Sequence, residues 1–179
     1  MIKHFFPFAA AFMLSSPAAA FEVTSPDMTD GKTLGMGQVA KNEHCSGGDV
    51  SPGLAWKDPP AGTKSFVVTM YDPDAPTGSG WWHWTVYNIP ASATGLPTGA
   101  GSGGKGLPAG AVQGRTDAGT AGFGGACPPP GLVHHYIVTV TALKAEKLDL
   151  PKDASAAMLG FMTGMNSLGK ATITATYGQ

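Results

Sequence analysis

The stretch from Met70 to Pro90 reads M-Y-D-P-D-A-P-T-G-S-G-W-W-H-W-T-V-Y-N-I-P and places a polar turn between two apolar segments. The first segment, Ser65 to Tyr71, is rich in β-branched and apolar residues and too short for a helix, which predicts a central strand. His83 to Ile89 predicts a second strand, which Pro90 ends. An acid at a strand end, facing an imidazole across a rigid and aromatic turn, predicts a polar pocket.

Weaker signals extend this pattern along the rest of the chain. The residues from Ala91 to Gly114 are glycine-rich and predict one long loop. One good helix is expected at Asp153 to Gly164, with Asp153 or Ser155 as its N-cap. The remaining predicted strands, from alternation or β-branched composition, are Phe21 to Ser25, a short one around Leu54 and Trp56, His135 to Leu143, and Lys170 to Tyr177.

Length and composition bound the architecture. A chain of 179 residues without repeat or linker is expected to fold as one domain. It has 26 glycines and 15 prolines but only 13% charged residues, which predicts many connections and few long helices. Strands dominate, so we expect a mostly β fold, a two-sheet β-sandwich with one peripheral helix at about residues 153–164. A formal net charge of -1 gives no reason to expect nucleic-acid binding.

The first twenty residues have the pattern of a secretory signal peptide. Lys3 provides a basic start, Phe5 to Leu14 is an apolar run, and Ala18 to Ala20 provides small residues for cleavage. The apolar run is shorter than the roughly 20 residues that span a bilayer, so a stable membrane anchor is not expected. We predict a signal peptide at 1–20, a mature domain at 21–179, and a periplasmic or secreted location.

Two cysteines, Cys45 and Cys127, remain in a chain bound for an oxidising compartment. An even pair there favours a disulfide over a metal site, since two sulfur ligands do not complete a tetrahedral shell. The bridge would close a loop of about 80 residues and stabilise the fold by roughly 4 to 5 kcal/mol in the chain-entropy model. It would also fix the loop at Asn42 to Gly48 against the segment that contains Cys127.

Two separated motifs give the chain a resemblance to a known family. D-P-D-A-P followed by W-W-H-W, and then G-F-G-G-A-C-P-P-P-G-L-V-H-H-Y at Gly122 to Tyr136, resemble the phosphatidylethanolamine-binding protein family, and its bacterial Raf-kinase-inhibitor-like branch most closely. The resemblance runs from about Phe21 to Tyr177. It implies a Greek-key β-sandwich and a small pocket that accepts anions. The C-terminal helix that partly covers the pocket in animal members has no evident counterpart after Tyr177.

The resemblance also implies which side chains line that pocket. An acid, two imidazoles and a phenol would supply its polar groups, and aromatic and proline faces would exclude water. The residues that match these positions are Asp72, Pro76, Trp81, His83, Pro128, Pro129, His134 and Tyr136. Asp72 would either hold His83 in its charged form or be protonated itself against a ligand oxygen.

Structural roles compete with these assignments. A strand-end acid is often a turn former, which we expect of Asp74 more than of Asp72. His83, between tryptophans, could be a core histidine. His134 and His135 are neighbours on a strand, so only one of them should face the pocket, and the resemblance favours His134.

We therefore expect an exported binding protein for a small anionic or phosphorylated ligand, without a cofactor and without enzymatic activity. The resemblance adds a role as inhibitor or modulator of a protein partner, of the kinase or peptidase class. The alternative is a metal-assisted hydrolase that uses Asp72, Asp74, His83 and His134, all residue types that bind metals. The sequence offers no tight metal-binding spacing and no nucleophile motif for that alternative.

Overall fold

The computed structural model describes residues 20–103 and 105–179, so the predicted signal peptide lies outside the described residues except for Ala20. The described chain is mostly β, as expected. Its elements, in order, are β1 (Glu22–Thr24), the 3-10 helix η1 (Met36–Gln38), β2 (Leu54–Lys57), β3 (Ser65–Asp72), β4 (Trp81–Pro90), β5 (Gly95–Leu96), β6 (Val112–Gln113), β7 (Val133–Leu143), α1 (Ala156–Asn166) and β8 (Ser167–Gly178).

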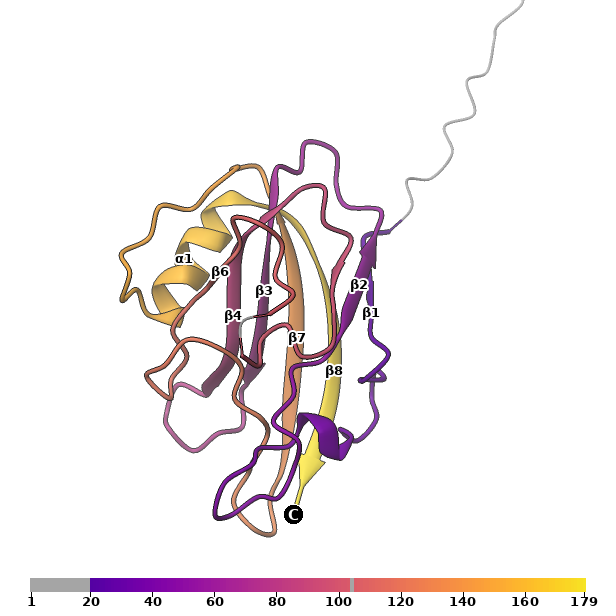
Figure 1. The fold of residues 1–179 in the computed structure, drawn as a ribbon, viewed down its shortest axis with the longest axis vertical. Helices are drawn as coiled ribbons and strands as arrows, with labels where there is room; N and C mark the ends of the chain where they lie inside the picture. Colours follow the sequence, from indigo (N-terminus) through magenta and orange to yellow (C-terminus); the bar gives the residue numbers. More distant parts are fainter. Residues whose placement is uncertain (1–19, 104) are drawn as a thin grey trace, which may run out of the picture.

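Two antiparallel sheets form the fold, and this confirms the predicted architecture (Figure 1). The small sheet has the order β1-β2-β5, and the large sheet the order β6-β4-β3-β7-β8. Within the large sheet, β3, β4 and β6 are successive neighbours, and β7 returns to lie beside β3. This order, with the fourth strand next to the first, is a Greek key.

β3, the central strand of the large sheet, is buried on both faces, which explains its apolar run from Phe66 to Val68. Phe66, Val68 and Met70 belong to the main core, together with residues of the small sheet such as Trp56. Val67 points to the other face, where it packs in a second cluster with Leu159 of α1. Successive strand residues alternate between faces, so a strand covered on both sides has few polar positions. Figure 1 shows α1 beside β6 and β4, away from β1 and β2.

Several element boundaries differ from those predicted; β7, for example, begins at Val133 rather than His135, and α1 ends at Asn166 rather than Gly164. β4 begins at Trp81 rather than His83, because Trp81 pairs directly with Asp72 across the hairpin. α1 begins at Ala156 because Ser155, not Asp153, is the N-cap: its side chain accepts a hydrogen bond from the Met158 backbone N–H. The last strand follows α1 without a connecting loop and begins at Ser167 rather than Lys170.

The prediction of a single loop at residues 91–114 was wrong, because the segment contributes a short strand to each sheet. β5 pairs with β2 and β6 pairs with β4. Each has only two residues, too few for any periodicity to show, and each depends on a partner strand that lies far away in the sequence. In the part of the chain that the structure describes, no helix is both long and apolar enough to span a bilayer.

Candidate functional site

A cavity of about 500 Å³ lies where β3 ends, β4 begins and the connection into β7 passes. All eight residues that the sequence analysis assigned to a pocket line it: Asp72, Pro76, Trp81, His83, Pro128, Pro129, His134 and Tyr136. They come from two segments separated by about forty residues of chain, which the Greek-key crossover brings together. The predicted convergence of the two motifs is therefore what the fold produces.

Asp72 is both a turn former and a cavity residue, roles that the sequence analysis treated as alternatives. Its Oδ1 accepts hydrogen bonds from the backbone N–H groups of Asp74 at 2.8 Å and Ala75 at 3.1 Å, which fixes the turn after β3. Its Oδ2 lies 2.8 Å from Nδ1 of His134. Both carboxylate oxygens are thus engaged, in a side chain that is almost fully buried.

The alternation of β7 sorts its polar residues between cavity and solvent. His134 and Tyr136 point inward and are buried, while Val133 and His135 are exposed. His135 pairs instead with Asp74, whose Oδ2 accepts a 2.7 Å hydrogen bond from the His135 backbone N–H and lies 2.7 Å from its Nδ1. As expected, one histidine of the pair faces the cavity, and Asp74 is not among the lining residues.

The imidazole of His83 forms a hydrogen bond with a backbone carbonyl. Its Nδ1 lies 2.8 Å from the Gly124 oxygen, and because a carbonyl can only accept, Nδ1 carries the proton. Its Nε2 lies 4.0 Å from Oδ2 of Asp72, a distance for electrostatic attraction rather than for a hydrogen bond. The ring also packs edge-on against Tyr136, with centroids 5.2 Å apart. His83 is therefore buried, yet its Nε2 is directed to the polar side of the cavity.

The charge of Asp72 follows from opposing effects. Burial by itself would raise the pKa of Asp72. The adjacent imidazoles of His83 and His134 and the Asp74 backbone N–H lower it by a larger amount, so the pKa lies below its ordinary value. Asp72 is therefore ionised at neutral pH, and Nδ1 of His134 donates the hydrogen bond between them. Of the two possibilities that the sequence left open, a protonated Asp72 is therefore the one that this geometry disfavours.

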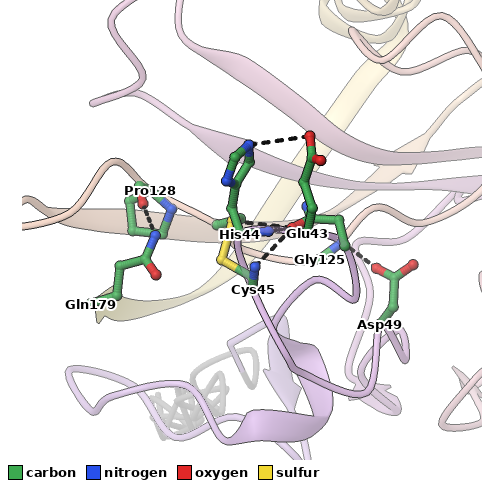
Figure 2. The surroundings of a disulfide bond; sticks show 9 residues. Glu43, His44, Cys45, Asp49, Gly125, Pro128 and Gln179 are labelled. Carbon is green, nitrogen blue, oxygen red and sulfur yellow. Dashed lines mark hydrogen bonds and ion pairs between the residues drawn. A yellow bond between two sulfur atoms is a disulfide. The ribbon is translucent and has the colours of Figure 1, made fainter.

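A disulfide joins Cys45 to Cys127, as predicted, and connects the loop at residues 42–48 to the cavity wall (Figure 2). Cys127 lines the cavity, immediately before Pro128 and Pro129. Figure 2 shows the contacts on either side of the bridge: Asp49 accepts a 2.7 Å hydrogen bond from the Gly125 N–H, and the Gln179 side chain donates one of 2.6 Å to the Pro128 carbonyl. The bridge is thus one of several attachments of this wall.

Sequence reasoning missed one side of the cavity, which Ala40, Lys41, Asn42 and Asp49 form. Here the chain after η1 runs directly against the second motif, with the Ala40 N–H donating to the Ala126 carbonyl at 2.9 Å. The approach is so close that a Cβ at Gly125 would lie 2.4 Å from the Ala40 nitrogen, so only glycine fits. The predicted disulfide was the only available signal for this side, since it places residues 42–48 near Cys127.

The family of the chain follows from comparison with known proteins. The family model described as phosphatidylethanolamine-binding protein matches residues 24–178, which is nearly the whole described chain. The chain belongs to this family. The resemblance inferred from the two motifs is therefore confirmed, and so is its extent from about Phe21 to Tyr177.

Relatives within the phosphatidylethanolamine-binding protein family are close. The chain is 54% identical to the UPF0098 protein YbcL of Escherichia coli over 94% of this chain and 93% of the relative, and 52% identical to YbhB of the same organism over 87% and 99%. The crystal structure of E. coli YbcL, described as a member of the mammalian family, superposes with a TM-score of 0.87 over 90% of this chain and 99% of that chain. A putative homolog from Chlamydia trachomatis, 28% identical, gives 0.75 over 89% and 98%.

A metal site requires several His, Cys, Asp or Glu side chains that converge on one point. Within residues 20–103 and 105–179, no group of three or more His, Cys, Asp or Glu side chains is arranged to hold a metal ion. The two oxygens of Asp72 already accept hydrogen bonds from two backbone N–H groups and from His134. A metal bound to Asp72 would therefore compete with these hydrogen bonds.

Proposed function

We propose that this chain is an exported, non-enzymatic binding protein whose cavity accepts a small anion, such as phosphate or a phosphoryl headgroup. Membership of the phosphatidylethanolamine-binding protein family supports a binding role. We infer an anion from the polar groups of the residues that line the cavity, and one of these groups is the main support for the inference.

That group is the hydroxyl of Tyr136, which is fully buried and forms no hydrogen bond with any described residue. Burial and the negative charge of Asp72 raise the pKa of Tyr136 far above its ordinary value, so the hydroxyl keeps its proton. A buried donor without a partner is unfavourable by about 1 to 3 kcal/mol. Because Tyr136 lines the cavity, an oxygen of a bound ligand is the partner that would remove this penalty.

The two imidazoles supply further donors when they are protonated. His83 and His134 both use Nδ1 to donate to the protein, so Nε2 is the nitrogen that each can offer to a ligand. A neutral imidazole presents a lone pair at Nε2, which would repel a phosphate oxygen, whereas a protonated one donates a charge-assisted hydrogen bond. Anion binding should therefore be accompanied by uptake of a proton.

Calorimetric titration of the purified chain with phosphate, phosphorylethanolamine and acetate tests the proposal. We expect saturable binding of phosphate, weakened about tenfold or more in His83→Ala, because a charge-assisted hydrogen bond contributes roughly 1.5 to 3 kcal/mol. Asp72→Ala should weaken it as well, since Asp72 orients His134. The heats measured in HEPES and in Tris should differ by the number of protons taken up times the difference between the ionisation enthalpies of the two buffers.

His135→Ala is the matched control, because His135 lies on the same strand but is directed away from the cavity, and its phosphate affinity should equal that of the wild type. The proposal would be defeated if the wild type did not bind phosphate. It would also be defeated if His83→Ala and Asp72→Ala bound phosphate as tightly as the wild type does. Metal analysis and a phosphoester hydrolysis assay on the same sample separate it from a metal-assisted hydrolase, which would require a bound metal and turnover.

Export and a protein partner are further parts of the proposal. Export is supported by the sequence pattern at residues 1–20 and is compatible with the disulfide, which forms in oxidising compartments. Cell fractionation and N-terminal sequencing of the mature protein test it, with Phe21 expected as the first residue. An inhibited or modulated partner is supported by family resemblance alone, and a pull-down from periplasmic extract, with and without phosphate, tests it.

A further inference from the structure

Lys41 is a cation on the side of the cavity that sequence reasoning did not anticipate. Its exposed side chain lines the cavity, together with that of the adjacent Asn42. No carboxylate of the described residues lies within 4.0 Å of its ammonium group, although other pairs such as Lys57 with Glu22 are present. It is the one lysine or arginine among the described cavity-lining residues. The cavity therefore has an unpaired positive charge at its solvent-exposed side.

The backbone that carries Lys41 is fixed. Lys41 forms an antiparallel bridge with Ser46, and the Asn42 N–H donates to the Cys45 carbonyl at 2.8 Å, which closes a tight loop. The Cys45–Cys127 disulfide attaches this loop to the neighbouring wall, where Ala40 donates a hydrogen bond to Ala126. The backbone of Lys41 is thus fixed relative to the buried groups of the cavity, and only its side chain is free to move.

The two carboxylates of the cavity each accept hydrogen bonds, although no described lysine or arginine forms an ion pair with either. Asp72 is bonded to His134 and to the turn after β3, deep in the cavity. Asp49, on the same side as Lys41, accepts the Gly125 N–H with its Oδ1. Lys41 therefore has no ion-pair partner among the described residues, and a negatively charged group of the ligand could become that partner.

The size of the cavity allows such a group. A volume of about 500 Å³ is within the range of sites that enclose whole small molecules, so phosphate alone fills only a part of it. A phosphoryl group bonded at Tyr136 and the imidazoles would leave its substituent in the rest of the cavity, which Lys41 borders. From this arrangement we infer a ligand preference, which rests on the binding of phosphoryl groups proposed above. The site selects phosphate esters that carry a second anionic group, such as a carboxylate, over esters with a cationic substituent.

Three phosphate esters with two-carbon substituents test this inference: phosphoglycolate, ethyl phosphate and phosphorylethanolamine, whose ends are negative, neutral and positive. We expect the wild type to bind phosphoglycolate about fivefold more tightly than ethyl phosphate, and phosphorylethanolamine more weakly than either. The factor is modest because solvent-exposed ion pairs contribute only about 1 kcal/mol. Lys41→Met should abolish the preference by weakening phosphoglycolate, with ethyl phosphate changed less than twofold. Lys41→Arg should retain the preference.

Lys64→Met is the matched control, because Lys64 is exposed just before β3, at the opposite end of that strand from Asp72. This variant removes the same charge and should keep the wild-type preference. Equal affinity of the wild type for the three esters, or a preference that persists in Lys41→Met, would overturn the inference and leave the proposed function intact. Failure of all three esters and of phosphate to bind would defeat the proposed function itself.

Discussion

Loss of the Cys45–Cys127 disulfide is expected to lower the free energy of unfolding by about 4 kcal/mol. The bridge joins positions 82 residues apart, and a cross-link that closes so long a loop removes much of the conformational entropy of the unfolded chain. Equilibrium urea unfolding of the oxidised wild type and of the Cys45→Ser/Cys127→Ser variant measures the difference. A loss of this size is a large share of the 5 to 15 kcal/mol typical of a folded domain.

The reduced wild type provides the internal comparison for this prediction. It should unfold at nearly the same urea concentration as the double serine variant, and a reducing agent should leave the variant unchanged. The hydrogen bonds from Gly125 to Asp49 and from Ala40 to Ala126 remain in the reduced protein, so we expect the fold to persist at 25 °C. A difference below about 1 kcal/mol would show that these contacts, rather than the cross-link, hold the cavity wall.

Asp72→Ala is expected to destabilise the fold by about 3 kcal/mol, the second largest effect. The substitution leaves three donors without their acceptor, namely the backbone N–H groups of Asp74 and Ala75 and Nδ1 of His134. Removing one partner of a buried charged pair typically costs about 3 to 5 kcal/mol, and we take the lower end because the turn can reach solvent. Urea unfolding at pH 7 measures the loss.

Acid provides a second test of Asp72, with Asp72→Asn as the matched variant. The folded-state pKa of Asp72 lies below the ordinary value of 3.8, so its ionised form stabilises the fold. That contribution is complete above the unfolded pKa and disappears as the pH falls through the lower folded pKa. The difference in unfolding free energy between the wild type and Asp72→Asn should therefore be constant from pH 7 to about 5 and shrink below about 4. If the difference in unfolding free energy did not change down to pH 2, the ionised form of Asp72 would not be what stabilises the fold.

The parts of the fold that could be predicted from sequence are those with a local signal. The apolar run of β3, the β-branched run of β7 and the capped helix α1 each carry their own periodicity, so their existence was predicted and only their ends differed. β5 and β6 could not be predicted, since two residues have no period and pair only because distant strands present an open edge. Long-range pairing, rather than local propensity, decides such elements.

The cavity shows the same division. Asp72, His83, His134 and Tyr136 could be assigned because they belong to two motifs that resemble a family. Lys41 and Asp49 could not, because nothing in their own neighbourhood marks them, and they reach the cavity only through contacts of residues 40–49 with 125–127.

The wall formed by Cys127, Pro128 and Pro129 continues into Pro130, and none of these three prolines has an amide proton. Hydrogen–deuterium exchange and amide-detected NMR will therefore be silent at these three positions, even if a ligand changes their environment. Trp81 also lines the cavity, and the fluorescence of its indole can report occupancy instead. The three other tryptophans, Trp56, Trp82 and Trp84, are not among the lining residues, so their replacement by phenylalanine would isolate that signal.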